Sequence, residues 1–530
     1  EKGMAQGTSY SPPRNERESA IIAAWTDVLG REGIGIDDHY FALGGDSIKA
    51  IQLVPRLLQM GWKMEVRDLF RYPTVAELAP HLVPAAQADK AEPVGGTVPL
   101  TAVQTWFFQE INRDRHHFNQ AVLLKGKPRF QDEALEAAIE AVCRHHDSLR
   151  LQFIENNGSV IQRYAEPGPA PHFEIMDLRG SKSAILQMDA HMNALQSGMN
   201  LEKAELVKAA VYRLDEADRL FISVHHLVMD AFSFRILLED LNAAYSRSVR
   251  RQEIQLLPKT ASFRTWAEKI HEYAQSDAMD EEKDYWHRIA RTPVSPLPSD
   301  FGPGENTRQQ AKVVHTELSE VETRFLFTRA HHAYDTQADD LLLAALAHAA
   351  GIWMGEKRTI VYRALHGREH IADDVDVSRT VGWFSGMCPI LFTLPDPENT
   401  GRLIVDTRDE LRKIPMSGIG YGLLRYICKD HELCDTPRHP EIVFINLGQF
   451  DREVETDWFS ATTEYTGDMF GPMQRRPFAL EVDVIVLRGR LRLTVIYDGT
   501  RFHDETVRRF FQNYLDALQN IIEHCKRVAA

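Results

Sequence analysis

The chain has 530 residues, of which 44% are hydrophobic and 26% charged, a balance typical of folded proteins that excludes a disordered chain. At roughly 100 to 200 residues per domain, this length predicts about three or four packed units. The 61 basic and 76 acidic residues give a formal charge of -15, and no block of lysine and arginine stands out, which argues against a nucleic-acid partner.

The apolar stretches and the cysteines indicate the compartment. The longest apolar stretches, such as 341–353, are shorter than the roughly 20 residues that a membrane helix needs, so we expect no membrane partner. The five cysteines are odd in number and include no CxxC pair, which indicates neither a disulfide framework nor a metal site. We therefore predict a cytoplasmic protein. The first residues lack a signal peptide, and the missing initial Met predicts a piece of a longer polypeptide.

The first hundred residues predict a small all-α domain. Apolar residues recur at helical spacing in 16–29, a second helical pattern runs from Ile48 to about Met60, and a short one begins near Thr74. The stretch that follows mixes Pro, Gly, Ala and charges without periodicity, which is typical of a linker. We predict a four-helix bundle.

About 430 further residues predict an α/β body, since helical patterns such as 132–145 alternate with β-rich runs such as 219–224 and 491–497. A Pro/Gly-rich stretch, 292–305, divides this body into halves of comparable size. We expect two lobes with a ligand cleft between them. The predicted units are a linker over 1–15, the bundle over 16–83, a linker over 84–97, an N-lobe over 98–290, an inter-lobe linker over 291–306 and a C-lobe over 307–525.

The segment DDHYFALGGDSIKAIQL, residues 37–53, carries the most specific signal of the bundle. Its two glycines permit a tight turn, and Ser47 opens a helix with its hydroxyl at the positive end of the helix dipole. A phosphate attached there would be well accommodated. The alternative is that Ser47 is only an N-cap.

This segment and the PPRNERE stretch before the bundle resemble the peptidyl carrier proteins of nonribosomal peptide synthetases. The resemblance implies 4'-phosphopantetheine on Ser47, with Gly45 and Asp46 beside it, attached by a phosphopantetheinyl transferase. It also implies an adenylation domain upstream in the same polypeptide. The GGDS sequence resembles carriers that precede epimerisation domains. Pro55 departs from the family, and we expect a kink in its helix.

Residues 221–241, FISVHHLVMDAFSFRILLEDL, predict a strand, a short loop and an amphipathic helix. Adjacent strand residues point to opposite faces, so we expect His225 and His226 to differ, one at a cleft and one in the packing, without sharing a metal. Taken alone, a buried histidine is more often structural than catalytic.

An ordered series of motifs resembles the epimerisation branch of the condensation superfamily over about residues 97 to 525. HHLVMDA is similar to HHxxxDG of that branch. The other matching segments are PLTAVQTWFF (99–108), RHHDSLR (144–150), RTVGWFSGMCPI (379–390), IPMSGIGYG (414–422) and VFINLGQFD (443–451). The resemblance implies two chloramphenicol-acetyltransferase-like lobes, with the HH loop at the floor of a tunnel.

Epimerisation of a thioester calls for proton-transfer groups on both faces of Cα. The resemblance implies His226 on one face, with His225 and Asp230 completing the HH motif. In three places the sequence departs from the family. Ala364 of ALHGRE stands where EGHGRE has its first Glu, and Asn446 of FINLGQFD replaces the Tyr of FNYLGQFD. Ala231 replaces the Gly of HHxxxDG.

The neighbours of these positions carry two further expectations. We expect Asp230 to form a buried structural ion pair, with Arg150 as the candidate partner. Glu369 and His366 follow Ala364 closely and are candidates to replace the lost acid.

Three functions remain open, and whether the chain is an enzyme is undecided among them. The departures favour an interface domain that has lost epimerisation and presents the carrier-bound amino acid to a trans-acting tailoring enzyme, as domains in glycopeptide and siderophore synthetases present it to oxygenases or β-hydroxylases. The second is an active L-to-D epimerase that uses His226. A peptide-bond-forming condensation domain is third. The amino acid carried is not predicted.

Overall fold

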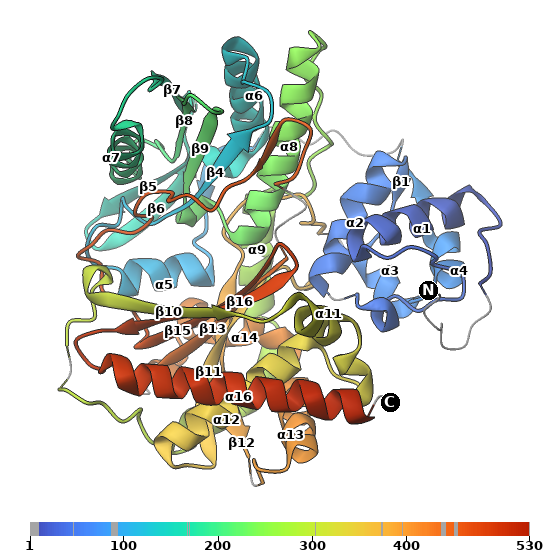
Figure 1. The fold of residues 1–530 in the computed structure, drawn as a ribbon, viewed down its shortest axis with the longest axis vertical. Coiled ribbons are helices and arrows are strands. Elements are labelled where there is room, and N and C mark those ends of the chain that lie inside the picture. The colour runs from blue at the N-terminus through green and yellow to red at the C-terminus, as the bar shows by residue number, and fades with distance from the viewer. Residues whose placement is uncertain are drawn as a thin grey trace.

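We describe the chain from a computed structural model. The structure describes residues 10–528 apart from 46, 86–93, 167, 169, 303, 373–374, 395, 436–440 and 450–453. Figure 1 shows a small helical domain beside a body of two lobes, one above the other. Within this described part, no helix is long and apolar enough to span a membrane.

The small domain is the predicted bundle of four helices around one core. The helices are α1 (Glu16–Leu29), α2 (Ser47–Gln59), α3 (Val66–Arg71) and α4 (Val75–Leu78), and the two-residue strands β1 (Trp62–Lys63) and β2 (Val83–Pro84) pair beside them. Ile21, Trp25 and Leu53 are fully buried at its centre. Helix α2 continues through Pro55, although proline removes one helical hydrogen bond.

The N-lobe contains two sheets. The five-stranded sheet has the order β14-β4-β9-β8-β7, and the three-stranded sheet has the order β3-β6-β5. Their strands are β3 (Thr97–Val98), β4 (Asn119–Gly126), β5 (Leu151–Asn156), β6 (Ser159–Tyr164), β7 (His172–Asp177), β8 (Val207–Arg213), β9 (Arg219–His225) and β14 (Phe459–Ala461). The helices are α5 (Ala102–Glu110), α6 (Asp132–His145), α7 (Ala184–Ser197), α8 (Ala231–Val249), α9 (Phe263–Ala274) and α10 (Asp277–Arg291).

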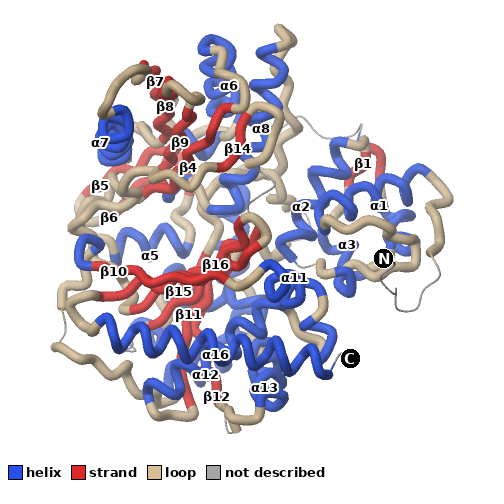
Figure 2. Tube along the Cα trace, in the orientation of Figure 1, coloured by secondary structure: helices blue, strands red, loops and turns tan. Residues whose placement is uncertain are grey.

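The C-lobe is built on one mixed six-stranded sheet in the order β10-β16-β15-β13-β11-β12. Its strands are β10 (Ala311–Glu317), β11 (Arg358–Leu365), β12 (Gly386–Thr393), β13 (Ile442–Gln449), β15 (Leu480–Leu487) and β16 (Arg490–Asp498). The helices are α11 (Glu320–Thr328), α12 (Ala338–Met354), α13 (Thr400–Arg412), α14 (Ile419–Gly422), α15 (His431–Asp435) and α16 (Asp504–Val528). Figure 2 shows the strands of the two lobes as separate groups, with α5 between them in this view and α16 below the C-lobe strands.

The two faces of the C-lobe sheet pack against different neighbours. Phe444 and Val482 belong to a core with α12 and α16, and we call their side the outer face. Tyr362 and Val443 belong to a core that includes N-lobe residues such as Val224, and we call their side the inner face. The inner face therefore borders the N-lobe.

One crossover joins the lobes. Strand β14, which comes late in the chain, pairs with β4 of the N-lobe sheet, with Phe459 opposite Gly126. The predicted assignment of all of 307–525 to the C-lobe does not hold for this strand. Sequence periodicity reports which residues are buried, whereas strand pairing across the lobes depends on the tertiary fold.

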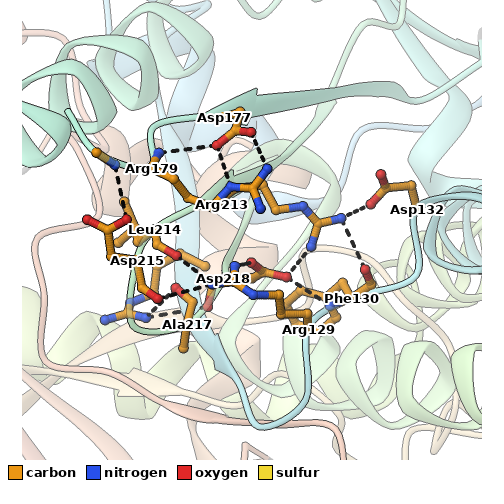
Figure 3. Close-up of polar contacts among 12 residues, drawn as sticks. Arg129, Phe130, Asp132, Asp177, Arg179, Arg213, Leu214, Asp215, Ala217 and Asp218 are labelled. Carbon is orange, nitrogen blue, oxygen red and sulfur yellow. Dashed lines mark hydrogen bonds and ion pairs between the residues drawn. The ribbon is translucent and has the colours of Figure 1, made fainter.

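The N-lobe sheet is stabilised at one end by a buried charge network, drawn in Figure 3. Asp218, just before β9, is fully buried. Its carboxylate accepts from Arg129 at 2.7 Å, from the backbone N–H of Phe130 at 2.9 Å and from Arg213. These bonds compensate the buried charge and hold the β8–β9 turn against the start of α6.

The small domain touches the body at two described places. Arg56 of α2 lies 3.6 Å from Glu239 of α8. The turn at Gly44 lies against the backbone of α11, where a Cβ on Gly44 would come within 3.2 Å of the carbonyl oxygen of Phe327. The turn at Gly44 therefore faces the C-lobe.

Candidate functional site

Strand β9 ends at two adjacent histidines whose rings have different surroundings. His225 is fully buried, its Nε2 donates to the carbonyl oxygen of Arg115 at 2.8 Å, and its Nδ1 accepts from the N–H of Leu227 at 3.2 Å. Burial lowers the pKa of His225 to about 3, so the ring is neutral at pH 7. Both nitrogens bond to the backbone, which leaves His225 no lone pair for proton transfer.

His226 has the surroundings of a base. It begins a short 3-10 turn and is half-buried, with ring centroids 4.3 Å from Trp383 and 5.4 Å from Phe118. The side-chain nitrogen of Gln120 lies 3.1 Å from its Nε2. When the Gln120 amide donates this bond, the ring proton is on Nδ1, so Nε2 is the nitrogen that takes a proton once a substrate displaces the amide. Burial lowers the pKa of His226, so the neutral ring can accept a proton near pH 7.

Asp230 is the N-cap of α8. Its Oδ1 accepts from the N–H of Ser233 at 2.7 Å, and its Oδ2 accepts from the N–H groups of Phe384 and Ser385 at 2.9 and 3.2 Å. Ala231 is the first helical residue and has no positive φ, so replacing the family's Gly by Ala requires no unusual backbone there. The carboxylate fixes the loop after the histidines against the segment that holds Trp383.

The predicted buried ion pair of Asp230 is formed with another arginine. Nη2 of Arg368 lies 3.8 Å from Oδ1 of Asp230 and donates to the hydroxyl of Ser233 at 2.9 Å. Arg150, the expected partner, instead contacts Asp147 at 3.3 Å and backbone carbonyls. The expectation of an Arg150 pair was wrong because RHHDSLR lies after α6, whereas Arg368 reaches α8 from the C-lobe.

The RHHDSLR segment supports the site from a distance. His146 bonds to Asp240 of α8 at 2.9 Å, and Arg379 of the RTVGWF segment bonds to the same carboxylate at 2.6 Å. The nitrogens of His145 and His146 and an oxygen of Asp240 lie close enough together for a metal ion. Since Asp240 is neutralised by Arg379, the arrangement is an ion-pair network that positions α8.

Ala364 lies on the inner face of the C-lobe sheet. It pairs with Met387 of β12, and it follows Arg363, which is opposite Phe444 of β13, as Ile445 follows Phe444. Met387 and Ile445 both pack against the core shared with the N-lobe. At the position of the family's first Glu, the structure therefore has a methyl group between two apolar neighbours.

Asn446 lies on the outer face. It pairs with Val484, a residue of the outer core. Its Nδ2 donates to Asp339 at the start of α12, and its Oδ1 accepts from the N–H of Gly448 at 2.8 Å. The sequence grouped Ala364 and Asn446 at one site. The structure separates them, because neighbouring positions along a sheet alternate between its faces.

Glu369 and His366, the candidates to replace the acid missing at Ala364, differ in their surroundings. Glu369 is buried, and neither of its oxygens has a hydrogen-bond partner. His366 lies 3.7 Å from Glu369, and its Nδ1 accepts from the N–H of Arg368 at 3.0 Å. The negative charge of Glu369 helps to raise the pKa of the Cys388 thiol, which is opposite Arg363. Glu369 therefore lies near Cys388, whose partner Arg363 directly precedes Ala364 in β11.

The carrier motif forms a tight turn before α2. Gly44 has φ 91°, and a Cβ on Gly45 would lie 2.3 Å from the ring of Tyr40, so only glycine fits there. Helix α2 begins at Ser47, which places free backbone N–H groups beside this residue. Asp46 lies outside the described residues. A phosphoester at this helix start fits the local geometry.

The model of the family "Condensation domain" matches residues 94–529. The chain belongs to the condensation domain family. The model "Phosphopantetheine attachment site" matches residues 19–82, so a carrier domain precedes the condensation-superfamily domain. This carrier holds 4'-phosphopantetheine covalently, which makes a phosphopantetheinyl transferase a partner. When bound, the arm supplies a thiol that carries its cargo as a thioester.

Known synthetases share most of this chain. It is 37% identical over 521 residues to surfactin synthase subunit 2 of Bacillus subtilis (strain 168), covering 97% of this chain and 14% of that protein. It is 35% identical to bacitracin synthase 2 of Bacillus licheniformis, covering 98% and 20%. The chain thus spans about a seventh to a fifth of these relatives. It is a nonribosomal peptide synthetase segment.

Solved structures agree with the two-lobed, chloramphenicol-acetyltransferase-like fold. The epimerization domain from the third module of tyrocidine synthetase B is 33% identical, with a TM-score of 0.78 over 82% of this chain and 99% of that one. The X-domain in complex with OxyB from teicoplanin biosynthesis is 18% identical, with a TM-score of 0.65 over 82% and 95%. The second similarity shows the fold alone.

Three residues at this site were missed by the sequence analysis. Gln120 contacts His226 from β4, Arg368 holds Asp230, and Asp483 lies on the inner face in β15. A polar residue alternating with apolar ones in a strand was the only available signal. In most strands that pattern means a solvated face, so it could not identify Gln120 and Asp483, and Arg368 lies in the loop after β11, where no such pattern applies.

Proposed function

We propose that the domain removes and returns the Cα proton of an aminoacyl or peptidyl thioester held on the Ser47 arm, with His226 as the base. The observation that carries this proposal is the neutral, half-buried ring of His226 beside Gln120 and Trp383. A thioester carbonyl acidifies its Cα–H, and a neutral imidazole can take that proton. The product of inversion is the D-configured thioester.

This proposal reverses the order favoured by the sequence. Loss of the Tyr at Asn446 had counted against epimerisation, yet Asn446 bonds to Asp339 on the outer face. Its replacement therefore removes nothing from the face that borders the N-lobe. The loss at Ala364 alone remains as an argument against two-sided proton transfer.

The test uses the whole chain loaded with an L-aminoacyl arm in deuterated water. Mass spectrometry follows Cα deuterium, and chiral chromatography of the released amino acid follows its configuration. The wild type should exchange Cα hydrogen roughly 100-fold or more faster than the His226→Ala variant. His172→Ala, which changes a half-buried N-lobe histidine paired with Glu174, is the matched control and should behave as the wild type. Equal exchange in the wild type and His226→Ala refutes the proposal.

Recruitment of a trans-acting tailoring oxygenase is the second candidate function. It is favoured by the absence of a carboxylate at Ala364, whose neighbours Met387 and Ile445 are apolar. Such a domain presents the tethered amino acid without inverting it. The loaded chain should then form a complex with an oxygenase of its own pathway in size-exclusion chromatography, and His226→Ala should leave that complex intact. Absence of a complex with every such enzyme counts against recruitment.

We place this activity in the cytosol and after an adenylation domain of the same polypeptide. All five cysteines are free thiols, which suits a reducing compartment. Cell fractionation tests the location. Sequencing of the full gene tests the order of domains.

A further inference from the structure

A row of side chains crosses the inner face of the C-lobe sheet at the level of Ala364. Ala364 follows Arg363, whose partner in β13 is Phe444. Ile445, the residue after Phe444, pairs with Asp483 of β15, which in turn pairs with Thr494 of β16. Along β15, Val482 and Val484 on either side of Asp483 are fully buried in the outer core, whereas Asp483 is half-buried. Asp483 therefore brings a carboxyl group to the inner face.

Asp483 has the surroundings of a protonated acid. Its Oδ1 is covered and has no hydrogen-bond partner. Burial, reinforced by the nearby charge of Glu481, raises the pKa of Asp483 well above its ordinary value. The positive charges of Arg308 and Arg476, which lie 3.5 and 3.6 Å from Glu481, oppose this effect. A raised pKa favours the protonated carboxyl, which can donate a proton.

A set of contacts leads from His226 to Arg308, whose charge acts on Asp483. The guanidinium of Arg308 lies 4.0 Å from the ring centroid of Phe470, which is 5.1 Å from that of Phe118, and Phe118 is 5.4 Å from His226. The positive charge of Arg308 lowers the pKa of both His226 and Asp483. The two groups therefore share one charged neighbour, while His226 comes from the N-lobe and Asp483 from the C-lobe sheet.

We propose that Asp483 is the second proton-transfer group of this site and replaces the carboxylate missing at Ala364. This inference rests on the proposed function. Ala364 in β11 and Asp483 in β15 are two strand spacings apart, roughly 10 Å. To receive a proton from Asp483, the substrate Cα must therefore lie closer to β15 than it would for a glutamate at position 364. A thioester bound between the lobes then has a base on one side and an acid on the other.

The step balances without another reactant. His226 takes the Cα proton, and the electron pair of the broken C–H bond moves into the enolate of the thioester. The carboxyl of Asp483 then gives its proton to the opposite face of Cα, and the enolate electrons form the new C–H bond. Imidazolium and carboxylate return to their starting states by proton exchange with water, so inversion consumes nothing.

Glu369 is the competing acid. Its carboxylate is buried near Cys388, opposite Arg363, and Arg363 bonds to Asp339 on the outer side. Glu369 itself lies in the loop after β11, and Cys388 belongs to the core shared with the N-lobe. Glu369→Gln therefore tests directly whether this buried carboxyl or that of Asp483 supplies the second proton.

The experiment measures Cα exchange and configuration in parallel on the loaded chain in deuterated water. Asp483→Asn should still exchange Cα hydrogen through His226 but keep the L configuration, with D-product formation reduced by roughly 100-fold or more. Glu369→Gln should match the wild type in both readouts. His226→Ala should lose both. The double variant Asp483→Asn with Ala364→Glu should regain inversion, because it restores a carboxyl on the inner face.

The outcomes separate the two proposals. D-product formation by Asp483→Asn at the wild-type rate overturns the role of Asp483 and leaves that of His226 standing. The role of Asp483 is also overturned if Asp483→Asn loses exchange and inversion together and the added Ala364→Glu restores neither. Asp483 is then a structural residue. A wild type that neither exchanges nor inverts overturns both proposals.

Discussion

Replacing Asp230 by alanine should destabilise the condensation domain while leaving the carrier domain unaffected. The side chain makes three hydrogen bonds to backbone N–H groups and one ion pair with Arg368. Loss of the N-cap bond removes about 1 kcal/mol. The N–H groups of Phe384 and Ser385 are left without their acceptor, at about 1 to 3 kcal/mol each. Because one carboxylate makes all these bonds, their sum is an upper bound, and we expect about 3 to 5 kcal/mol.

Thermal unfolding followed by tryptophan fluorescence measures this loss. For lobes of this size, about 4 kcal/mol corresponds to a lower Tm by on the order of 10 °C. Asp230→Asn keeps a good N-cap, but its amide nitrogen faces the N–H groups of residues 384 and 385, so its loss should lie between those of the wild type and Asp230→Ala. Asn399→Ala removes a single exposed cap bond, to Arg402, and should lose about 1 kcal/mol.

A catalytic role for Asp230 gives a different pattern. If Asp230→Ala unfolds at the wild-type temperature and yet loses Cα exchange, the carboxylate acts on the substrate and the structural argument is refuted. Equal Tm values for Asp230→Ala and Asn399→Ala would show that Phe384 and Ser385 find water instead. Attachment of the phosphopantetheine arm should stay normal in every variant.

Ser47→Ala should abolish the mass gain of one arm after treatment with a phosphopantetheinyl transferase, and an arm on that variant would refute the assigned attachment site. Asp218→Ala should destabilise the N-lobe by about 3 to 5 kcal/mol, because it removes the buried acceptor shared by Arg129, Arg213 and the N–H of Phe130, and an unchanged urea midpoint would contradict this. His225 has a folded pKa of about 3, so below about pH 6.5 the unfolded chain binds more protons than the folded chain. The stability therefore falls as the pH is lowered, and His225→Gln should make this fall less steep. Asp340, with its pKa raised to about 6 by burial, opposes this trend between about pH 4 and 6. A fall in Tm as steep in His225→Gln as in the wild type would exclude His225 as its source.

Local patterns were sufficient for the elements and the family. Apolar spacing predicted α1 and α6 with the bounds that the structure has, because an amphipathic helix must repeat every 3.6 residues to bury one face. The motif series predicted a carrier followed by a condensation-superfamily domain. The side-by-side histidines predicted rings in different surroundings, because adjacent strand residues alternate between faces.

Relations between distant segments required the tertiary structure. Arg368 is the partner of Asp230 because the two lobes bring α8 and the end of β11 together, and nothing in local spacing distinguishes it from Arg150. The register of four strands places Asp483 in the row of Ala364 and Asn446 on the other face. Sequence motifs group residues by the order of the chain. Chemistry groups them by the face of the sheet, which is set only when the strands pair.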